Sequence, residues 1–365
     1  MPAASTNDHD WGKNIPSTLR HSPLYRHLHV CIEQDPEIAS LRGLIAPHQP
    51  FHVLFFTVIN YLLLREQEEG REHPFAAFHA YLTPMPLPVE EAYPAFRDFV
   101  LLHGEELRQL LPHARLQTNE VARCANLLPA FEMVFERGGR KPLALVEIGA
   151  SAGFNLYWDR YDYTYHKTNC TIPVHVTGNV PSPVQIACTL QGELIPPLPA
   201  SLPEVASRIG IDLTPRHCQN ANDVRWLRAC IWPEERWRYD LLDAVLAVAQ
   251  QDPPPVLAGD ACDVLPGVLA DLQARASHET LCLYHSYALQ QGPAAVRERV
   301  FDLLAAHSQT RDVYRISLEW NQPRGWLTPR LELFTYQGGK QTQEEWLAGC
   351  DVHGSPMQWL VTGKS

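Results

Sequence analysis

The chain has 365 residues, of which 45% are hydrophobic and 19% are charged. This composition is typical of a folded globular protein and argues against long disordered segments, and the length allows two domains. The formal net charge of -11 disfavours non-specific binding to nucleic acid or to anionic lipid.

The amino terminus contains no basic segment followed by an apolar one, so no secretory signal is expected. The longest apolar run, 53–64, is interrupted by Thr57 and Asn60 and is much shorter than the roughly 20 residues of a transmembrane helix. The 9 cysteines are scattered and form no C-x-x-C motif, so we predict buried thiols and no metal site. The sequence therefore predicts a cytoplasmic protein without membrane or nucleic-acid partners.

Residues 1–139 are predicted to form a helical domain. The apolar run 53–64 indicates one buried helix, and apolar residues at helical spacing from Tyr93 to Leu110 indicate another. A third helix is predicted over 120–136, with Thr118 or Asn119 as its cap.

The third helix begins with an unusually polar group, made of Gln117, Asn119, Glu120 and Arg123. These residues suit a well-capped helix with an exposed salt bridge. They also suit a polar rim above a ligand site, in which Glu120 and Arg123 contact the substrate and Gln117 and Asn119 help to bind it. Both interpretations remain open at this point.

The segment Leu143–Tyr157, LALVEIGASAGFNLY, predicts a buried strand, a loop of small residues and a helix. Such a turn brings backbone N–H groups to a helix N-terminus, where a nucleotide can bind. The loop Gly149–Gly153 matches the G-x-S-x-G elbow of serine hydrolases. A tight turn needed only for packing is a third interpretation.

The rest of the chain alternates strands with helices. Residues 163–202 contain short β-like runs and are predicted to form an inserted hairpin or small sheet. Strands are expected at 207–212, 256–261, 281–286 and 313–319, helices at 222–232, 233–250 and 296–307, and a closing antiparallel pair at 331–336 and 358–361. This pattern predicts an α/β domain over 140–365, with a mostly parallel sheet and a ligand site outside the carboxyl ends of its strands.

A serine esterase would need an acid and a histidine after Ser151, and Asp260 and His353 come in that order. It would also need several strands before the elbow and a loop for the oxyanion hole. The preceding residues are predicted to be helical, which makes the esterase the weaker alternative.

The segment from Leu143 onward resembles class I S-adenosylmethionine-dependent methyltransferases. Glu147 matches the acid of their first motif, Gly149 and Gly153 match two of its glycines, and Ser151 replaces the middle one. The resemblance implies that Asp212 binds both ribose hydroxyls, and that Asp260 and the N–H of Ala261 meet the adenine ring. It implies S-adenosylmethionine as cofactor, held by Glu147, Gly149, Ala150, Ser151, Gly153, Asn155, Asp212, Asp260 and Ala261.

Several motifs along nearly the whole chain are also similar to a bacterial family of uncharacterised proteins that is known only as a domain of unknown function. They include 117–124, Gly149–Asn155, 158–161, 224–232 and 317–319. This resemblance brings no reaction with it.

From these observations we expect a Rossmann-like, class I methyltransferase-like domain over 140–365, preceded by a helical cap. The expected function is methylation of a small molecule, with His285 as general base, because an imidazole titrates near neutral pH. Glu319 is expected to contact the substrate. The alternative is a non-catalytic protein that binds a nucleotide or metabolite in the same crevice. The sequence does not indicate an oligomeric state.

Overall fold

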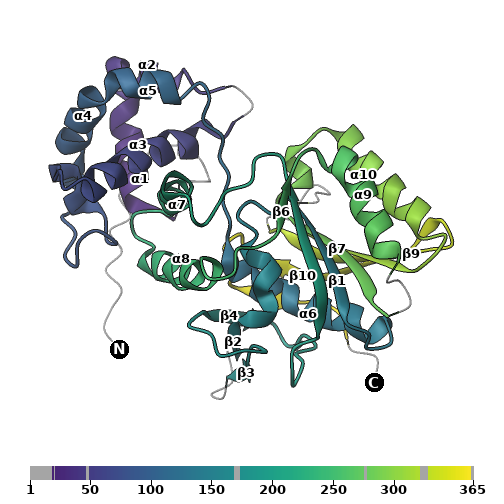
Figure 1. Ribbon diagram of the computed structural model, residues 1–365. Coiled ribbons are helices and arrows are strands. Elements are labelled where there is room, and N and C mark those ends of the chain that lie inside the picture. Colours follow the sequence, from purple (N-terminus) through teal and green to yellow (C-terminus); the bar gives the residue numbers. More distant parts are fainter. Residues whose placement is uncertain are drawn as a thin grey trace. The chain divides into compact units, whose positions relative to one another are not determined.

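The computed structural model describes residues 19, 21–46, 49–167, 173–274, 278–320 and 328–362. By its internal contacts the chain divides into two compact units (Figure 1). Unit 1 takes its described residues from Met1–Thr118 and Val224–Asp240, and unit 2 takes them from Asn119–Asp223 and Leu241–Ser365.

Unit 1 is built from helices around one apolar core. Helix α1 begins after Ser22, whose hydroxyl oxygen accepts a hydrogen bond from the N–H of Tyr25 at 3.1 Å, and Pro23 is its first residue. The apolar run seen in the sequence forms α3, in which Leu54, Phe55 and eight other positions are buried along with Glu66. The elements of this unit are α1 (Pro23–Glu33), α2 (Pro36–Arg42), α3 (Phe51–Glu68), η2 (Pro74–Phe78), η3 (Val89–Glu91), α4 (Ala92–Leu102) and α5 (Gly104–Leu110).

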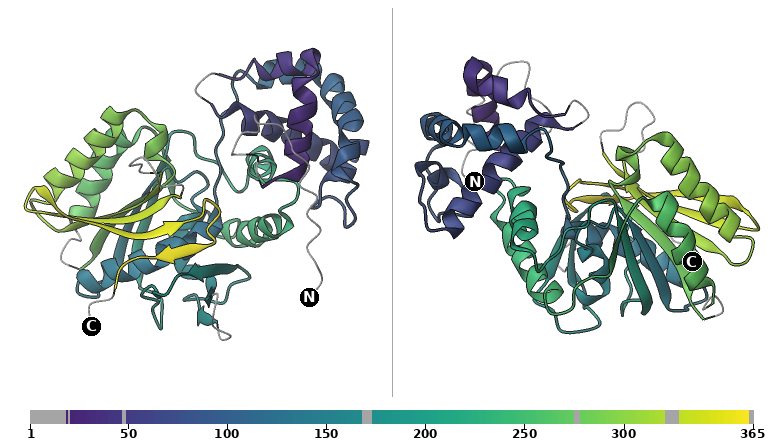
Figure 2. Two further views of the ribbon diagram at one scale, coloured as in Figure 1. Left: turned by 180° about the vertical axis from the view of Figure 1, so that it is seen from behind. Right: turned by 45° about the horizontal axis from the view of Figure 1, so that its top comes forward.

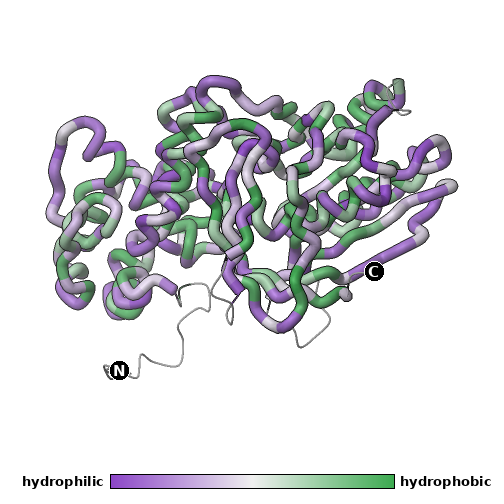
Figure 3. Tube along the Cα trace, turned by 90° about the horizontal axis from the view of Figure 1, so that it is seen from below, coloured by the Kyte–Doolittle hydropathy of each residue, from purple (hydrophilic) through white to green (hydrophobic). Residues whose placement is uncertain are grey.

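The helix expected between Tyr93 and Leu110 is two helices, because α4 ends at Leu102 and α5 starts at Gly104. Glycine has a low helix propensity, which favours an interruption at this point. Along the trace in Figure 3, hydrophobic and hydrophilic residues intermingle within the helices, as expected for helices that bury one face and expose the other.

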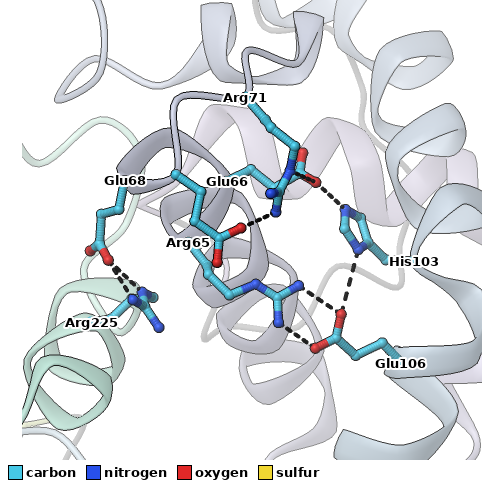
Figure 4. Close-up of polar contacts among 8 residues, drawn as sticks. Arg65, Glu66, Glu68, Arg71, His103, Glu106 and Arg225 are labelled. Atoms are coloured by element: carbon cyan, nitrogen blue, oxygen red, sulfur yellow. Dashed lines mark hydrogen bonds and ion pairs between the residues drawn. The ribbon is translucent and has the colours of Figure 1, made fainter.

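A charged cluster lies where α3 meets α5 and α7 (Ala221–Ala229) (Figure 4). Arg65 donates to the carboxylate of Glu106 through both terminal nitrogens, one of them at 2.7 Å. The buried Glu66 lies 3.2 Å from the Nε of Arg71 and 3.2 Å from the Nε2 of His103. Members of the cluster are Arg65, Glu66, Glu68, Arg71, His103, Glu106 and Arg225.

The domain boundary expected at residue 139 differs from the division into units. Unit 1 ends at Thr118 and then takes in Val224–Asp240. The reason is packing: Trp226 and Trp232 are buried in the helical core, and the side-chain amide of Asn60 donates to the carbonyl of Ala229 at 3.1 Å. The bounds of two helices also differ, because the predicted helices 222–232 and 233–250 are observed as α7 and as α8 (Arg236–Ala249).

Unit 2 is organised around a sheet whose described strands follow the order β3-β2-β4-β11-β10-β9-β8-β7-β1-β5-β6. Five neighbouring strands are parallel: β6 (Val256–Ala258), β5 (Val205–Asp212), β1 (Leu143–Ile148), β7 (Thr280–Ser286) and β8 (Val313–Glu319). This is the order of the parallel strands in a Rossmann-like sheet, in which ligands bind outside the carboxyl ends. The predicted α/β class with a mostly parallel sheet is confirmed.

Helices cover both faces of these strands. Helices α9 (Ala261–Gln273) and α10 (Ala294–His307) lie together along one face, as Figures 1 and 2 show from several sides. They pack on a core that includes Val146 and Ile148 of β1 and Leu283 of β7. Helix α6 (Cys124–Arg137) packs on the other face, where the ring of Phe131 meets that of Tyr284 edge-on at 5.1 Å.

The segment 163–202 does not form a separate small sheet. Its described strands, β2 (Asp162–Lys167), β3 (Val174–Val176) and β4 (Gln185–Gln191), extend the main sheet, because β4 pairs with β11 (Met357–Trp359). A buried tyrosine connects these strands to α6, because the phenol of Tyr165 donates to the carbonyl of Ala125 at 2.8 Å.

The closing antiparallel pair also differs from the prediction. Strand β9 (Arg330–Gln337) and strand β11 do not pair with each other, because β10 (Lys340–Cys350) lies between them. The first half of β10 is exposed and polar, so it lacks the apolar alternation by which strands are predicted.

Candidate functional site at the carboxyl ends of the strands

The loops that follow β1, β5, β6 and β7 at their carboxyl ends form what we call the carboxyl edge, residues 149–153, 213–215, 259–261 and 287–288. The loop after β1 is held by the end of β5. The N–H of Gly149 donates to the carbonyl of Ile211, and the N–H of Ser151 donates to Oδ2 of Asp212, both at 2.8 Å. The two segments that the methyltransferase resemblance assigns to the cofactor are therefore in direct contact.

The glycines of the loop are required by protein packing. Gly149 and Gly153 both have φ of +74°, a left-handed conformation that favours glycine. A Cβ at Gly149 would lie 2.2 Å from the Cβ of Ala288, and one at Gly153 would lie 2.6 Å from that of Pro254. These contacts support the tight-turn interpretation of the two positions. Because protein packing alone explains both glycines, they are not evidence for a cofactor site.

Ser151 is the unusual residue of the loop. Its φ is +53°, which is strained for a residue with a Cβ, and its side chain is buried with 2% of its surface exposed. Its hydroxyl has no hydrogen-bond partner among the described residues. Leaving a buried hydroxyl without a partner costs about 1–3 kcal/mol, so this atom is suited to meeting a ligand.

The residues expected to assist a serine nucleophile are engaged elsewhere. Asp260 caps α9, because its Oδ1 accepts from the N–H of Cys262 at 2.8 Å. His353 lies with its Nδ1 3.3 Å from Oε2 of Glu120. A nucleophilic serine needs a base within hydrogen-bond reach of its oxygen. Within the described part of the chain, Ser151 has none, which counts against the esterase.

Asp212 is the acid best placed to hold a ligand at this edge. It is the last residue of β5 and is nearly buried, and its Oδ1 accepts from the N–H of Thr214 at 2.8 Å. A carboxylate has about four acceptor positions, so it can bind several donors at once. Ala261, the first residue of α9, follows the capping Asp260 directly.

Glu147 lies deeper, on the face that α6 covers. Burial raises the pKa of its carboxyl to about 8, so it is mainly protonated at neutral pH. The phenol of Tyr284 donates to its Oε2 at 3.1 Å, and Asn155 also hydrogen-bonds to it. Asn155 in turn accepts a bond from the thiol of Cys124 at 3.5 Å. Glu147 and Asn155 are thus parts of one buried polar chain beneath the loop.

His285 is not placed as a general base. Successive residues of a strand point to opposite faces, and β1 and β7 pair with Glu147 opposite Tyr284 and Ile148 opposite His285. His285 therefore faces α9 and α10, with Ile148, whereas Glu147 faces α6. The strand alternation separates two residues that we had expected to share one site.

Both ring nitrogens of His285 are also in use. Arg315 has only donors, so its contact with Nε2 of His285 at 3.1 Å requires that nitrogen to accept. The opposite nitrogen, Nδ1, then carries the proton and donates to Oε1 of Glu319 at 2.8 Å. In this geometry the lone pair of Nε2 is already engaged by Arg315, so the ring presents no acceptor to a substrate proton.

Glu319 belongs to the same buried network and not to a substrate surface. Its Oε1 also accepts from the N–H groups of Ala288 and Leu289, at 3.1 and 2.8 Å. Burial raises its pKa, but the interactions with His285 and the backbone donors outweigh that effect and lower the pKa overall. Glu319 therefore acts as an anchor for the loop after β7.

Arg123 lies beside the carboxyl end of β7, and Glu120 lies beside His353. The helix predicted over 120–136 begins as a short turn, η4 (Val121–Arg123), before α6. Both side chains are buried, and Arg123 donates from Nε to the carbonyl of Val352 at 2.8 Å and from Nη1 to the hydroxyl of Ser286 at 3.4 Å. The exposed salt bridge that we considered for this group is not observed.

The other two residues of that polar group have different positions. Asn119 does not cap the predicted helix; its Oδ1 accepts from the N–H of Phe154 at 3.1 Å, at the start of η5 (Phe154–Arg160). It therefore holds the ligand loop in place. Gln117 belongs to unit 1, where its carbonyl accepts from the thiol of Cys230 at 3.6 Å.

Tyr287 is a residue of this edge that the sequence did not indicate. It has φ of +57°, its phenol oxygen is buried without a hydrogen-bond partner in the described residues, and the guanidinium of Arg123 stacks 4.0 Å from its ring centroid. Its loop touches that of Ser151 through the contact of Gly149 with Ala288. A buried polar atom without a partner is a property of the fold, so no sequence pattern could have revealed it.

The residues that the structure describes contain neither a metal site nor a membrane-spanning helix. No group of three or more His, Cys, Asp or Glu side chains among them is arranged to hold a metal ion. The helices described here include none that is both apolar enough and long enough to cross a membrane.

Comparison with protein families matches residues 17–359 to a family described as an uncharacterised protein conserved in bacteria, DUF2332. Comparison with curated proteins and with solved structures gave no match to either.

Proposed function

Because the chain belongs to this family of uncharacterised bacterial proteins, we propose its function from the carboxyl edge alone: it binds S-adenosylmethionine and transfers the methyl group to a small molecule. The observation that carries the proposal is the contact between Asp212 and Ser151, at the ends of neighbouring parallel strands. The order β6-β5-β1-β7-β8, followed by the antiparallel β9, supports a class I methyltransferase-like core.

Two features of the edge fit an adenosyl ligand. Asp212 offers carboxylate oxygens to a pair of ribose hydroxyls, and Ser151 has a buried hydroxyl that lacks a partner among the described residues. Asp260 and Ala261 follow the adjacent strand β6 and are the residues that would meet the adenine ring. When bound, the cofactor supplies an electrophilic methyl group.

The residues that we propose to contact the substrate are Glu120 and Arg123. Arg123 contacts Ser286 at the carboxyl end of β7, and Oε2 of Glu120 lies 3.3 Å from Nδ1 of His353. Bringing the two reactants together in a fixed orientation is a large part of catalysis for such a transfer, and buried charged side chains can provide it. His285 has no part in this proposal.

A second candidate function is binding without catalysis. It is favoured by the state of His285, because the imidazole expected to act as base is held in a closed network with Arg315 and Glu319. A protein that only senses or carries an adenosyl compound would need Asp212 and Ser151 but no base. Methyl transfer to an acceptor that has no proton to lose would need none either.

Calorimetry with S-adenosylhomocysteine tests the cofactor. The variant Asp212→Asn keeps the shape of the side chain but loses the charge, and we expect its affinity to fall by about 1.5–3 kcal/mol, the value of a hydrogen bond to a charged group. Asp252→Asn is the matched control, since Asp252 is exposed and precedes the amino-terminal end of β6. We expect no change there.

Two results would contradict the proposal. One is an absence of binding to S-adenosylmethionine and S-adenosylhomocysteine at millimolar concentration. The other is equal binding by the wild type and Asp212→Asn. If adenosine and ATP bind as tightly as the two sulfur compounds, the non-catalytic nucleotide-binding function is favoured.

A further inference from the structure

Three hydrogen-bond donors gather at the carboxyl end of β7. Ser286 is the last residue of that strand, Tyr287 follows it, and Arg123 of η4 contacts both. We call Arg123, Ser286 and Tyr287 the donor cluster. Tyr287 is the member of this cluster that the sequence did not indicate.

The hydroxyl of Ser286 is oriented by Arg123. A guanidinium group can only donate, so the oxygen of Ser286 accepts from Nη1 at 3.4 Å. The proton of the hydroxyl is then directed away from Arg123 and can be donated to another acceptor. Ser286 therefore adds a second hydrogen-bond donor, the hydroxyl proton, next to the guanidinium of Arg123.

The phenol of Tyr287 is a donor that lacks an acceptor. Its oxygen is buried and has no hydrogen-bond partner among the described residues. Burial raises the pKa of this phenol, so it keeps its proton at neutral pH. A buried donor without an acceptor destabilises the folded state, and so does a φ of +57° at a residue with a side chain. No contact of the phenol oxygen within the described residues compensates for either effect.

The position of Tyr287 is fixed from both sides. On one side its ring stacks against the guanidinium of Arg123, with 4.0 Å between the Cζ atom and the ring centroid. On the other side the next two residues donate their N–H groups to Glu319. The strained conformation is therefore imposed by the surroundings, as expected for a functional position.

We propose that the donor cluster binds a carboxylate or phosphate group of the ligand, with Tyr287 donating to one of its oxygens. Arg123 contacts both the hydroxyl of Ser286 and the ring of Tyr287, and guanidinium and hydroxyl donors are the groups that recognise such anions. This inference rests on the proposed function for the identity of the ligand, but not for the anion chemistry. The anion belongs either to the amino-acid end of the adenosyl cofactor or to the second substrate.

The test compares Tyr287→Phe, which removes one oxygen atom, with the wild type. S-adenosylhomocysteine carries a carboxylate, and methylthioadenosine is an adenosyl compound without one. We expect Tyr287→Phe to weaken one anionic ligand about 10- to 100-fold, the usual range for a donor to a charged group. Acetate and inorganic phosphate, followed by thermal shift, serve as probes for the second substrate.

Comparing the adenosyl compounds with acetate and phosphate shows whether the anion belongs to the cofactor or to the second substrate. If Tyr287→Phe weakens S-adenosylhomocysteine and leaves methylthioadenosine unchanged, the cluster binds the amino-acid end of the cofactor. If both adenosyl compounds bind as in the wild type but stabilisation by acetate or phosphate is lost, the cluster binds the second substrate. Either result supports the proposal.

Tyr165→Phe is the matched control, because Tyr165 is also buried but donates to Ala125. It should lower the melting temperature without changing binding of any probe, whereas Tyr287→Phe should leave the melting temperature of the free protein unchanged or higher. Arg123→Lys provides a second variant, since lysine keeps the charge but lacks the planar fork of donors. It should weaken the same probe as Tyr287→Phe.

The proposal is overturned if Tyr287→Phe binds all four probes as the wild type does. It is also overturned if the wild type binds none of them. If the wild type binds neither adenosyl compound but binds acetate or phosphate through Tyr287, the cofactor assignment fails and the anion site stands.

Discussion

The charged cluster of unit 1 and the carboxyl edge of unit 2 are both rich in polar side chains, yet they are organised in opposite ways. In the cluster each carboxylate shown in Figure 4 faces at least one cation, such as Glu68 with Arg225 at 2.9 Å. At the edge, Ser151 and Tyr287 have buried oxygen atoms without a partner in the described residues, and strained backbones. Satisfied groups stabilise a fold, whereas unsatisfied ones cost energy and indicate a binding site.

The network of His285 shows that the distinction does not follow the boundary between units. His285, Arg315 and Glu319 lie near the edge in sequence, but they form a closed buried group like that of unit 1. Proximity to the ends of parallel strands is therefore not sufficient for a functional role. The predictions below test which polar groups stabilise the fold and which do not.

The largest effect is expected for His285→Ala. The side chains of His285 and Glu319 are each 2% exposed, and removal of the imidazole leaves a buried carboxylate without its ring N–H donor. Loss of a hydrogen bond to a charged group costs about 1.5–3 kcal/mol of unfolding free energy, and the cavity left by the buried ring adds to that cost. Urea denaturation measures it. If stability is unchanged while ligand binding is lost, His285 belongs to the site after all.

Glu147→Gln should change how stability depends on pH. The pKa of Glu147 is raised from 4.5 to about 8, so the folded protein holds an extra proton between these values. Its contribution to stability is complete below pH 4.5 and is lost as the pH rises through 8. The slope reaches about 1.4 kcal/mol per pH unit, and the glutamine variant should lack it.

His79 of unit 1 provides the opposite case for the same experiment. Burial lowers its pKa from 6.5 to about 4, so its contribution to stability is lost as the pH falls through that range. Hydrogen exchange of peptides from each unit, corrected for intrinsic rates, should show unit 1 weakening toward acid and unit 2 toward alkali. Parallel behaviour of both units would contradict the assignment of these two groups.

Glu106→Gln should cost about 1 kcal/mol, the value of a well-oriented but partly exposed ion pair. The hydrogen bond from Arg65 lowers the pKa of Glu106, so this contribution is present above pH 4.5 and declines as the pH falls. Denaturation at low salt and in 1 M salt checks the effect, because about 1 M salt screens charges beyond roughly 3 Å. A loss that does not decrease with salt would rule out an ion pair.

The smallest effect is expected for Ser151→Ala, and Ser22→Ala is its counterpart in unit 1. Both serines are buried, but the hydroxyl of Ser22 caps α1 and donates to Glu234 at 2.9 Å. Ser22→Ala should cost about 1 kcal/mol, whereas Ser151→Ala should be neutral or slightly stabilising. Thermal unfolding of both variants tests this directly. An equal loss in both would show that Ser151 is a structural residue.

Ser151 can also be tested for nucleophilic chemistry. The proposed function predicts that a serine-directed fluorophosphonate does not label the protein, because the hydroxyl lacks a base among the described residues. Stoichiometric labelling that disappears in Ser151→Ala would restore the esterase alternative.

Local sequence patterns are sufficient to identify the elements of the α/β unit. The run Leu143–Ile148 is apolar enough to identify a buried strand, and the small residues that follow identify a tight turn. Alternation of strands with helices gave the mostly parallel sheet and the end at which its polar residues collect. These features arise from residues that are close together in the sequence, and a sequence pattern can therefore predict them.

Tertiary packing determines which polar residues share a surface. The side chains of β1 and β7 alternate predictably, but the register that sets Ile148 beside His285 arises from the pairing of strands 137 positions apart in the chain. The return of Trp226 to unit 1 and the unpartnered oxygens of Ser151 and Tyr287 depend in the same way on distant contacts. Local propensity cannot specify such contacts, because each is fixed only when both partners are packed.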